Sequence, residues 1–303
     1  MTKTVSPIIK STATEQTAFS TVSRVQYQQQ DDNQPSKVFE RATPINDQVI
    51  VEQPLQISLC FFNAEQQRYQ SKILTVTMRT PNDDQALICG FLCAEGIIQQ
   101  ANEVIAIEWL APNEQNLPQN HAEVTLAKHV QVNWPQLQRD FVSYSSCGIC
   151  GKSSLKSLAL KVQSTIDETQ HWLPNQLISG LPTLLWQQQA LFQQTGGVHG
   201  AGYYANQQLL FSAEDVGRHN AVDKVIGKVC QQQAQQAQAV LILSGRISFE
   251  LVQKAVMANI PVIVAVGAPS SLAIQAAQQF NITLIGFVKA QKFNVYHADW
   301  RLC

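Results

Sequence analysis

The sequence predicts an α/β protein with a smaller, strand-rich subdomain in its N-terminal half. Strand and helix patterns alternate over the C-terminal half, which is typical of an α/β layer with parallel neighbouring strands. Between residues 38 and 140, short segments with a two-residue apolar period favour strands. With 303 residues, the chain is long enough for one large domain or two smaller ones.

Residues 1–37 are polar, rich in Ser, Thr, Gln and Asp, and lack a sustained apolar period, so we expect a disordered tail. In the strand-rich subdomain, residues 38–140, apolar alternation appears at 55–61, 74–78, 104–107 and 124–126. A helix is expected over about 83–95, because aspartates occupy its first turn and Gly96 follows its end.

The remaining residues, 141–303, are expected to form the α/β core. Strands are predicted at 202–212, 239–244, 261–266 and 282–288, and helices at 217–231, 248–259 and 270–280. The run 240–243 is continuously apolar, as expected of a strand that helices cover on both sheet faces.

Polar segments follow three of these strands, at 214–219, 244–246 and 267–271. In open α/β sheets, ligands bind at the carboxyl ends of the strands. A helix N-terminus there offers free N–H groups and a positive dipole end, which suits phosphate. These segments therefore predict an anion-binding edge; simple capping of the helices by Ser244, Ser248 and Ser270 is the alternative.

The composition excludes several classes of partner. Apolar residues make up 45%, which is ordinary for a globular protein, and the net charge of −1 indicates no basic field for nucleic acid. The longest apolar runs, such as 261–266, are too short to span a bilayer, and residues 1–16 lack the apolar segment of a secretory signal. We expect a cytoplasmic protein without a membrane or nucleic-acid partner.

Seven cysteines, an odd number and mostly scattered, argue against a disulfide framework. We expect four of them to be small buried side chains: Cys60, Cys89, Cys93 and Cys230. The two that stand out are Cys147 and Cys150, because glycines flank them in the segment SSCGICGK.

Metal chemistry is one interpretation of this pair. A structural zinc site needs four ligands, and the chain has no second Cys-x-x-Cys. Zinc deaminases combine His-x-Glu with a later Pro-Cys-x-x-Cys, and His121-Ala122-Glu123 supplies the first part. However, Ser146 replaces the proline, and the alternation over 121–126 predicts a strand where a deaminase has a helix.

Sulfur chemistry is the interpretation that we favour. Lys152 and a helix predicted to begin at about residue 153 both favour the thiolate, which is the reactive form of cysteine. Gly148 and Gly151 leave the sulfur atoms open to a bulky partner. A thiolate of this kind attacks a disulfide or takes up sulfur as a persulfide.

Several motifs, in order along about residues 38–298, resemble the formate dehydrogenase accessory sulfurtransferase family, FdhD. They occupy residues 90–96, 145–151, 195–199, 214–224, 244–250 and 268–273. The family fold is similar to that of cytidine deaminases without their zinc site. The resemblance therefore implies a mixed sheet flanked by helices, with no tightly held metal.

The resemblance also implies a function. Such a protein receives sulfur from a cysteine desulfurase as a persulfide on Cys147, assisted by Cys150, and passes it to the molybdenum cofactor in its bis-guanine-dinucleotide form for formate dehydrogenase. It also implies a homodimer. The family's cofactor segment corresponds to Phe287, Val288, Lys289, Ala290, Gln291 and Lys292. The strand-end residues expected to meet the phosphates are Arg218, His219, Ser244 and Arg246.

The segment 289–292 departs from the family, whose loop is typically richer in arginine and glycine. Lysine meets a phosphate as a point charge rather than as a bidentate fork. Two alternatives to the sulfurtransferase stay open at this point: a zinc-dependent deaminase-like hydrolase, and a non-catalytic chaperone that only binds the cofactor.

Overall fold

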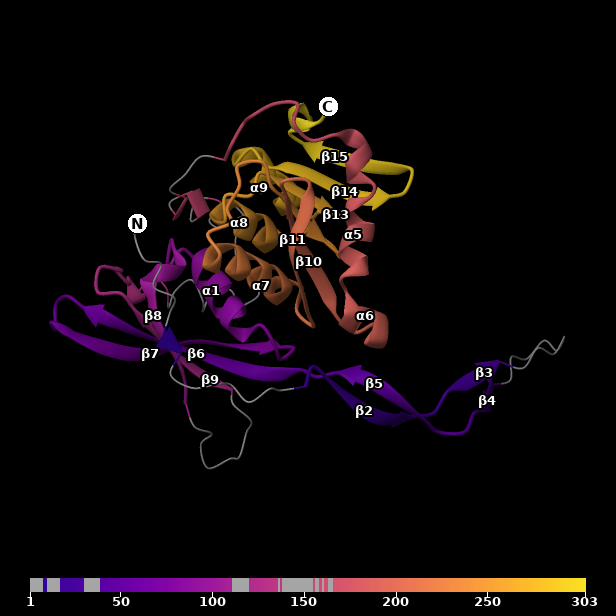
Figure 1. Ribbon diagram of the computed structural model, residues 1–303, viewed down its shortest axis with the longest axis horizontal. Helices are drawn as coiled ribbons and strands as arrows, with labels where there is room; N and C mark the ends of the chain where they lie inside the picture. The colour runs from indigo at the N-terminus through magenta and orange to yellow at the C-terminus, as the bar shows by residue number, and fades with distance from the viewer. Residues whose placement is uncertain are drawn as a thin grey trace.

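The computed structural model describes residues 8–9, 17–29, 39–110, 120–135, 137, 155, 158–159, 161–162 and 166–303. Its body consists of alternating sheet and helix layers (Figure 1). Helices α1 (Asp84–Ala94), α7 (Arg218–Gln231) and α8 (Phe249–Met257) lie between an N-terminal and a C-terminal sheet. The mixed α/β class predicted from the sequence is therefore confirmed.

The N-terminal sheet has the strand order β1-β8-β9-β6-β7. Its strands are β1 (Ile8–Ile9), β8 (Val104–Trp109), β9 (His121–Leu126), β6 (Gln53–Asn63) and β7 (Arg68–Arg79). Strand β6 pairs antiparallel with β7 and parallel with β9. The alternation predicted at 55–61 is confirmed, because Leu55, Ile57 and Leu59 are fully buried against the helices.

The C-terminal sheet has the order β11-β10-β12-β13-β14-β15. Its strands are β11 (Gln208–Asp215), β10 (His199–Ala205), β12 (Val240–Leu243), β13 (Val262–Ala265), β14 (Thr283–Lys289) and β15 (Lys292–His297). Strands β12, β13 and β14 are parallel, whereas β10 and β15 pair antiparallel with their neighbours. The sheet is mixed rather than wholly parallel.

Both faces of the central strands are covered, as the apolar run 240–243 predicts. Leu241 and Leu243 belong to the core shared with α1, α7 and α8. Val240 and Ile242 belong to a second core with α4 (Asn175–Ile178) and α5 (Leu181–Gln187) on the opposite face. Helix α9 (Ser271–Gln279) packs beside α8, and α6 (Ala190–Thr195) follows α5. Single-turn 3-10 helices lie at Ala101–Glu103 and Asp299–Arg301.

One predicted strand, 202–212, is wrong. The segment forms the hairpin β10–β11, in which Ala205 pairs with Gln208 across a two-residue turn. Asn206 and Gln207 take the positive φ values, 50° and 63°, that such turns require. Neither residue is glycine, so the sequence carries only a weak turn signal.

Parts of the segment 1–37 also differ from the disorder expected of it. Strand β2 (Phe19–Arg24) pairs with β5 (Ile45–Ile50), and β3 (Tyr27–Gln29) pairs with β4 (Phe39–Arg41). These ribbons project from the body (Figure 1) and are mostly exposed. Backbone hydrogen bonds form them with little apolar burial, so composition alone did not indicate them. In the part of the chain that the structure describes, no helix is long and apolar enough to cross a membrane.

Candidate functional site

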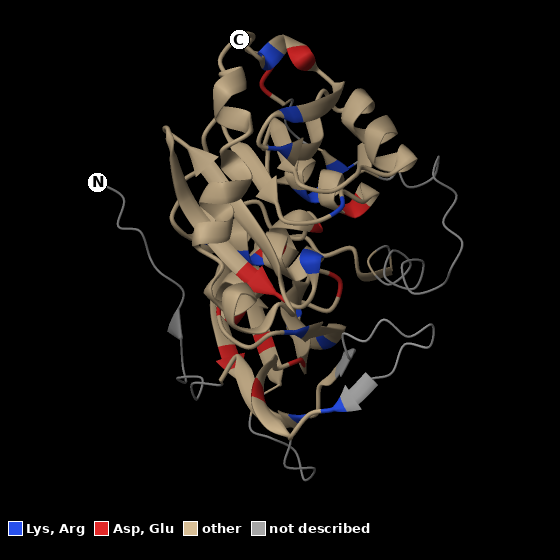
Figure 2. Cartoon of the chain, turned by 90° about the vertical axis from the view of Figure 1, so that its right-hand side faces the viewer, with Lys and Arg blue, Asp and Glu red and all other residues tan. Residues whose placement is uncertain are grey.

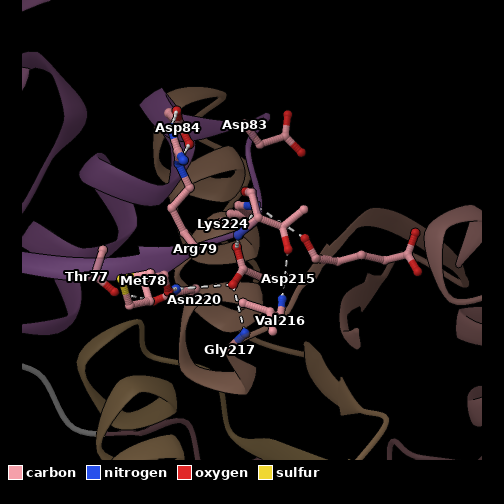
Figure 3. A network of polar contacts seen from close by, with 12 residues as sticks. Thr77, Met78, Arg79, Asp83, Asp84, Asp215, Val216, Gly217, Asn220 and Lys224 are labelled. Carbon is pink, nitrogen blue, oxygen red and sulfur yellow. Dashed lines mark hydrogen bonds and ion pairs between the residues drawn. The ribbon is translucent and has the colours of Figure 1, made fainter. Parts of the chain in front are cut away.

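The motif 214–224 divides into residues that hold the site and residues that face it. Asp215, at the end of β11, is fully buried and accepts hydrogen bonds from the backbone N–H groups of Gly217 (2.8 Å) and Thr80 (3.1 Å). Lys224 Nζ lies 2.7 Å from Asp215 Oδ2 and also donates to the Thr80 carbonyl (Figure 3). This ion pair joins the middle of α7 to the end of β11, and the hydrogen bonds of both residues to Thr80 attach them to the end of β7.

Asn220 completes the same network. Its side-chain nitrogen donates to the Met78 carbonyl at 2.7 Å and to Asp215 Oδ1 at 3.1 Å, and its oxygen accepts from the Thr77 hydroxyl (Figure 3). Because both its amide groups are used, Asn220 is a structural residue. The network fixes the direction in which α7 leaves the sheet, and with it the positions of Arg218 and His219.

Four basic side chains come together at the strand ends. His199 begins β10, Arg218 and His219 open α7, and Arg246 follows β12. The charges of Arg218 and Arg246 both interact with His199, and the charge of Arg218 also interacts with His219, so these groups lie close to one another. The carboxylate of Glu250, in the first turn of α8, interacts with Arg218 and His219, so the cluster is basic but includes one acidic neighbour. In the rest of the body, basic and acidic positions both occur (Figure 2).

The two histidines of this cluster are held in the neutral form. Burial, followed by the nearby arginines, lowers the pKa of His199. Burial, followed by Lys254 and Arg218, lowers the pKa of His219 to about 4. His219 Nε2 lies 3.2 Å from the Ser248 hydroxyl at the N-cap of α8, which orients the ring. At neutral pH the histidines are hydrogen-bonding groups, and the arginines carry the charge.

Arg218 has an unused hydrogen-bond donor. Its Nε atom is buried and has no hydrogen-bond partner among the described residues. A buried donor without a partner is rare, and a bound anion is one group that satisfies it. Another basic side chain occupies the carboxylate of Asp223 on the same helix. Asp223 is buried and bonds Lys254 Nζ at 2.7 Å.

Backbone hydrogen bonds connect the loops that follow β12 and β13 with each other and with a bulge inside β14. Gly267 N donates to the Gly245 carbonyl at 3.1 Å, and Phe287 N donates to the Gly267 carbonyl at 3.1 Å. Phe287 has a positive φ of 52° at a bulge in β14 and is 44% exposed. It therefore lies beside the strand-end loops.

The rest of the segment 287–292 forms the β14–β15 hairpin. Lys289 pairs with Lys292 across the turn of Ala290 and Gln291, and all of these residues are exposed. Val288 differs, because its side chain is buried in the core beneath α5. The structure thus attaches Phe287 to the site loops and leaves Lys289 to Lys292 on an exposed hairpin.

Ser244 has a different role from the cap that the sequence suggested. Its hydroxyl accepts a hydrogen bond from Gly200 N at 2.8 Å, which holds the end of β12 against β10. Ser248 occupies the N-cap of α8, but its hydroxyl bonds His219. Only Ser270 of these serines caps a helix through its side chain, by accepting from Ala273 N at 3.2 Å.

A cavity of about 430 Å³ adjoins the cluster and was not predicted from the sequence. His199 and Ser244 line its polar side, and Leu185, Trp186 and Phe192 are among its apolar residues. Trp186 is 52% exposed, which is unusual for so large an apolar side chain. In the sequence, the one indication that Trp186 is exposed is its place in the glutamine-rich stretch 186–189.

Cys147 and Cys150 lie outside the described residues. The rival metal motif is described, and His121 and Glu123 lie on strand β9, as expected, rather than on a helix. His121 Nε2 bonds Ser58 Oγ at 2.9 Å, and Glu123 bonds Ser71. Within the described ranges there is no group of three or more side chains placed to hold a metal ion.

Known proteins resemble this chain over most of its length. A sulfur carrier protein FdhD from Streptomyces avermitilis is 41% identical over 261 residues, covering 84% of this chain and 89% of its own. The sulfur carrier protein FdhD of Picrophilus torridus is 38% identical, covering 85% and 93%. A solved Desulfotalea psychrophila protein, described as a candidate formate dehydrogenase accessory protein, shares the fold with a TM-score of 0.66 at 24% identity, covering 93% and 99%.

The FdhD/NarQ family itself matches residues 52–303, which include the C-terminal sheet, all strands of the N-terminal sheet except β1, the four basic residues at the strand ends and the cysteine motif. That match covers well over half of the sequence. The chain therefore belongs to the FdhD/NarQ family.

Proposed function

We propose that the chain is a sulfurtransferase that carries sulfur as a persulfide on Cys147 and delivers it to the molybdenum cofactor. The observation that carries this proposal is the convergence of Arg218, Arg246 and His199 at one sheet edge, in a chain whose relatives are named sulfur carrier proteins. A sulfur carrier for a nucleotide-bearing cofactor needs a reactive thiol and a diphosphate site, and the sequence supplies candidates for both.

The first step loads the thiol. The thiolate of Cys147 attacks the terminal sulfur of a persulfide on a cysteine desulfurase. The bond between the desulfurase cysteine and that sulfur breaks, and the desulfurase leaves as a thiolate. Cys147 then carries the terminal sulfur, and no net oxidation has occurred.

The second step delivers sulfur to molybdenum at the oxidation level of sulfide. Cys150 attacks the inner sulfur of the Cys147 persulfide, forming a Cys147–Cys150 disulfide and releasing hydrogen sulfide, which replaces an oxo ligand as water leaves. A thiol reductant then restores the two thiols. This step assigns Cys150 a supporting role that differs from that of Cys147.

The strand-end cluster is the proposed site for the cofactor, the bis-molybdopterin guanine dinucleotide form. Arg218 and Arg246 suit a diphosphate, because guanidinium groups bind phosphate oxygens in pairs. The adjacent cavity of about 430 Å³ is large enough for a guanine base, and Trp186 offers an aromatic face for stacking. The exposed Phe287 and Lys292 are proposed as further contacts.

The proposal places the reaction in the cytoplasm between two protein partners. A cysteine desulfurase is the sulfur donor, and formate dehydrogenase receives the sulfurated cofactor. We further propose that the protein acts as a homodimer, as the resemblance implies.

Mass spectrometry of the intact chain tests the sulfur-carrying step. After incubation with a cysteine desulfurase and cysteine, the wild type should gain the mass of one sulfur atom, located on Cys147 and removed by a thiol reductant. Cys147→Ala should not gain it, whereas Cys303→Ala, which removes an exposed cysteine, should.

The same preparation separates the alternatives. Absence of added sulfur on Cys147, under conditions that load another sulfur acceptor, would leave only a cofactor-binding chaperone. Stoichiometric zinc that is lost in Cys147→Ala would instead support the deaminase-like hydrolase.

A further inference from the structure

Two buried thiols meet where the helices α1 and α7 cross. Cys93 Sγ on α1 lies 3.2 Å from Cys230 Sγ on α7, and the residues are 6% and 7% exposed. A third thiol, Cys89, is fully buried one turn earlier on α1 and accepts a hydrogen bond from Gln231. The expectation that these three cysteines are buried is confirmed, whereas Cys60, which was expected to be buried too, is only partly buried. Burial alone does not explain thiols in direct contact.

Glycines bring the thiols together. A Cβ atom at Gly90 would lie 1.8 Å from the Asp223 carbonyl oxygen, and one at Gly227 would lie 1.9 Å from the Ala86 carbonyl oxygen. The helices therefore touch backbone to backbone at this point. Cys93 and Cys230 each follow one of these glycines by three residues, so both lie on the contacting faces about one turn further on.

A cavity leads to the pair. It has a volume of about 400 Å³, and both Cys93 and Cys230 line it, together with Gln99, Lys161, Gln235 and Asn259. Apolar side chains such as Ile98, Val256 and Met257 also line it, so the cavity offers both polar and apolar contacts to a small molecule. The volume lies in the range that holds low-molecular-weight compounds, so a small reagent can meet the sulfur atoms without separating the helices.

The contact makes the two thiols unequal. The Cys93 thiol donates its proton toward Cys230 Sγ, and this hydrogen bond lowers the pKa of Cys230. Gln235 Nε2, 3.8 Å from the same sulfur, is a second donor. The hydrogen bond and burial raise the pKa of Cys93. Cys230 is therefore the better nucleophile of the pair, and Cys93 is placed to react second.

We propose that Cys93 and Cys230 are a redox-active dithiol, which a low-molecular-weight disulfide oxidises reversibly to a disulfide between α1 and α7. The Cys230 thiolate attacks the reagent, whose S–S bond breaks, and one reagent thiolate leaves with a proton. Cys93 then loses its proton and attacks Cys230 Sγ, which expels the second reagent thiol. Two protein thiols are oxidised, and one disulfide is reduced to two thiols.

The consequence is a covalent link between the halves of the fold. Along the chain, helix α1 connects strands β7 and β8 of the N-terminal sheet, and α7 carries Arg218 and His219 of the strand-end cluster. The linked residues are 137 positions apart, so the bond constrains a long segment of the unfolded chain and raises the unfolding midpoint. In a reducing compartment such a bond is transient, as is typical of redox sensing. This inference does not depend on the proposed function.

Oxidised glutathione tests the proposal on the full chain. Cys147→Ser and Cys150→Ser are introduced first, so that the reagent does not react at the proposed carrier thiol. After oxidation, alkylation and tryptic digestion, we expect one linked pair of peptides, lighter by two hydrogens and released by dithiothreitol. Trypsin leaves Cys89 and Cys93 in one peptide, so Cys89→Ala is the matched control and should retain the link.

Two further outcomes decide the matter. In Cys93→Ala, Cys230 should accumulate a mixed disulfide with glutathione, because no second thiol resolves it. The exposed Cys303 reports that the reagent is active. Glutathione on Cys303 without the linked peptides, or loss of the link in Cys89→Ala, would overturn the proposal.

Discussion

Replacing Lys224 by Met should destabilise the fold far more than the same change one turn later, at Lys228. Lys224 is 1% exposed, and its ammonium group lies 2.7 Å from the fully buried Asp215. The same nitrogen donates to the carbonyls of Thr80 and Glu214, at 2.9 and 3.2 Å. Methionine keeps much of the aliphatic volume, so the change removes mainly the charge and these contacts.

The geometry sets the size of the effect. Removing one partner of a buried ion pair costs roughly 3–5 kcal/mol, because the remaining charge stays buried. Asp215 retains N–H donors from Thr80, Gly217 and Asn220, which favours the lower end, about 3 kcal/mol. Lys228 forms an equally short bridge, 2.7 Å, to Asp83, but side-chain exposures of 24% and 44% limit its contribution to about 1 kcal/mol.

Urea unfolding followed by circular dichroism measures both variants at neutral pH. Lys224→Met should lose at least about 2 kcal/mol more than Lys228→Met. The double variant Asp215→Asn/Lys224→Met should recover part of the loss, because it leaves no buried charge. Equal losses for the two lysine variants, at unchanged dependence on urea concentration, would refute the reasoning.

Two further predictions concern the strand-end cluster. The pKa of His219 is lowered from its ordinary 6.5 to about 4, so the unfolded state takes up a proton that the folded state refuses. The contribution of His219 to the free energy of unfolding is fully present above pH 6.5 and falls by about 3 kcal/mol as the pH drops toward 4. Urea unfolding midpoints measured across this pH range should therefore depend much less on pH in His219→Gln than in the wild type. The proposed diphosphate site is tested by calorimetric titration with guanosine diphosphate. Arg246→Ala should weaken binding about tenfold or more, whereas Arg68→Ala on the N-terminal sheet should leave it unchanged. Equal affinities of the two variants for guanosine diphosphate would contradict the site.

The local structure of the chain could largely be predicted from its sequence. The run 240–243 is buried on both faces because each alternate side chain enters a different core, as its continuous apolarity indicates. Helix α1 occupies nearly the range that the first-turn aspartates and Gly96 suggest. The turn at Asn206 and Gln207 was not predicted, because neither residue is a glycine that would indicate positive φ values. The pairing of β10 with β11 imposes these values.

The site was only partly predictable. The segment 214–219 was predicted to form part of an anion-binding edge, yet its Asp215 serves the junction with β7, together with Asn220 and Lys224. Only Arg218 and His219 face the cluster. Residues adjacent in sequence point in different directions around a helix, and a motif does not specify which part of the structure each side chain contacts. The cavity beside Trp186 requires α5 to lie against β10, which no local pattern specifies.

By itself, the sequence determined most of the strands and helices of the body and the family that the chain resembles, because these depend on local periodicity and on residues close together in the chain. The suitability of Cys147 and Cys150 for sulfur chemistry stays a prediction from the sequence. Only the tertiary structure decided that His199, Arg218 and Arg246 converge, and that Cys93 meets Cys230. Such contacts depend on the crossing of distant elements. At α1 and α7 that crossing is set by the absence of side chains at Gly90 and Gly227, whose significance appears only when the two helices are placed together.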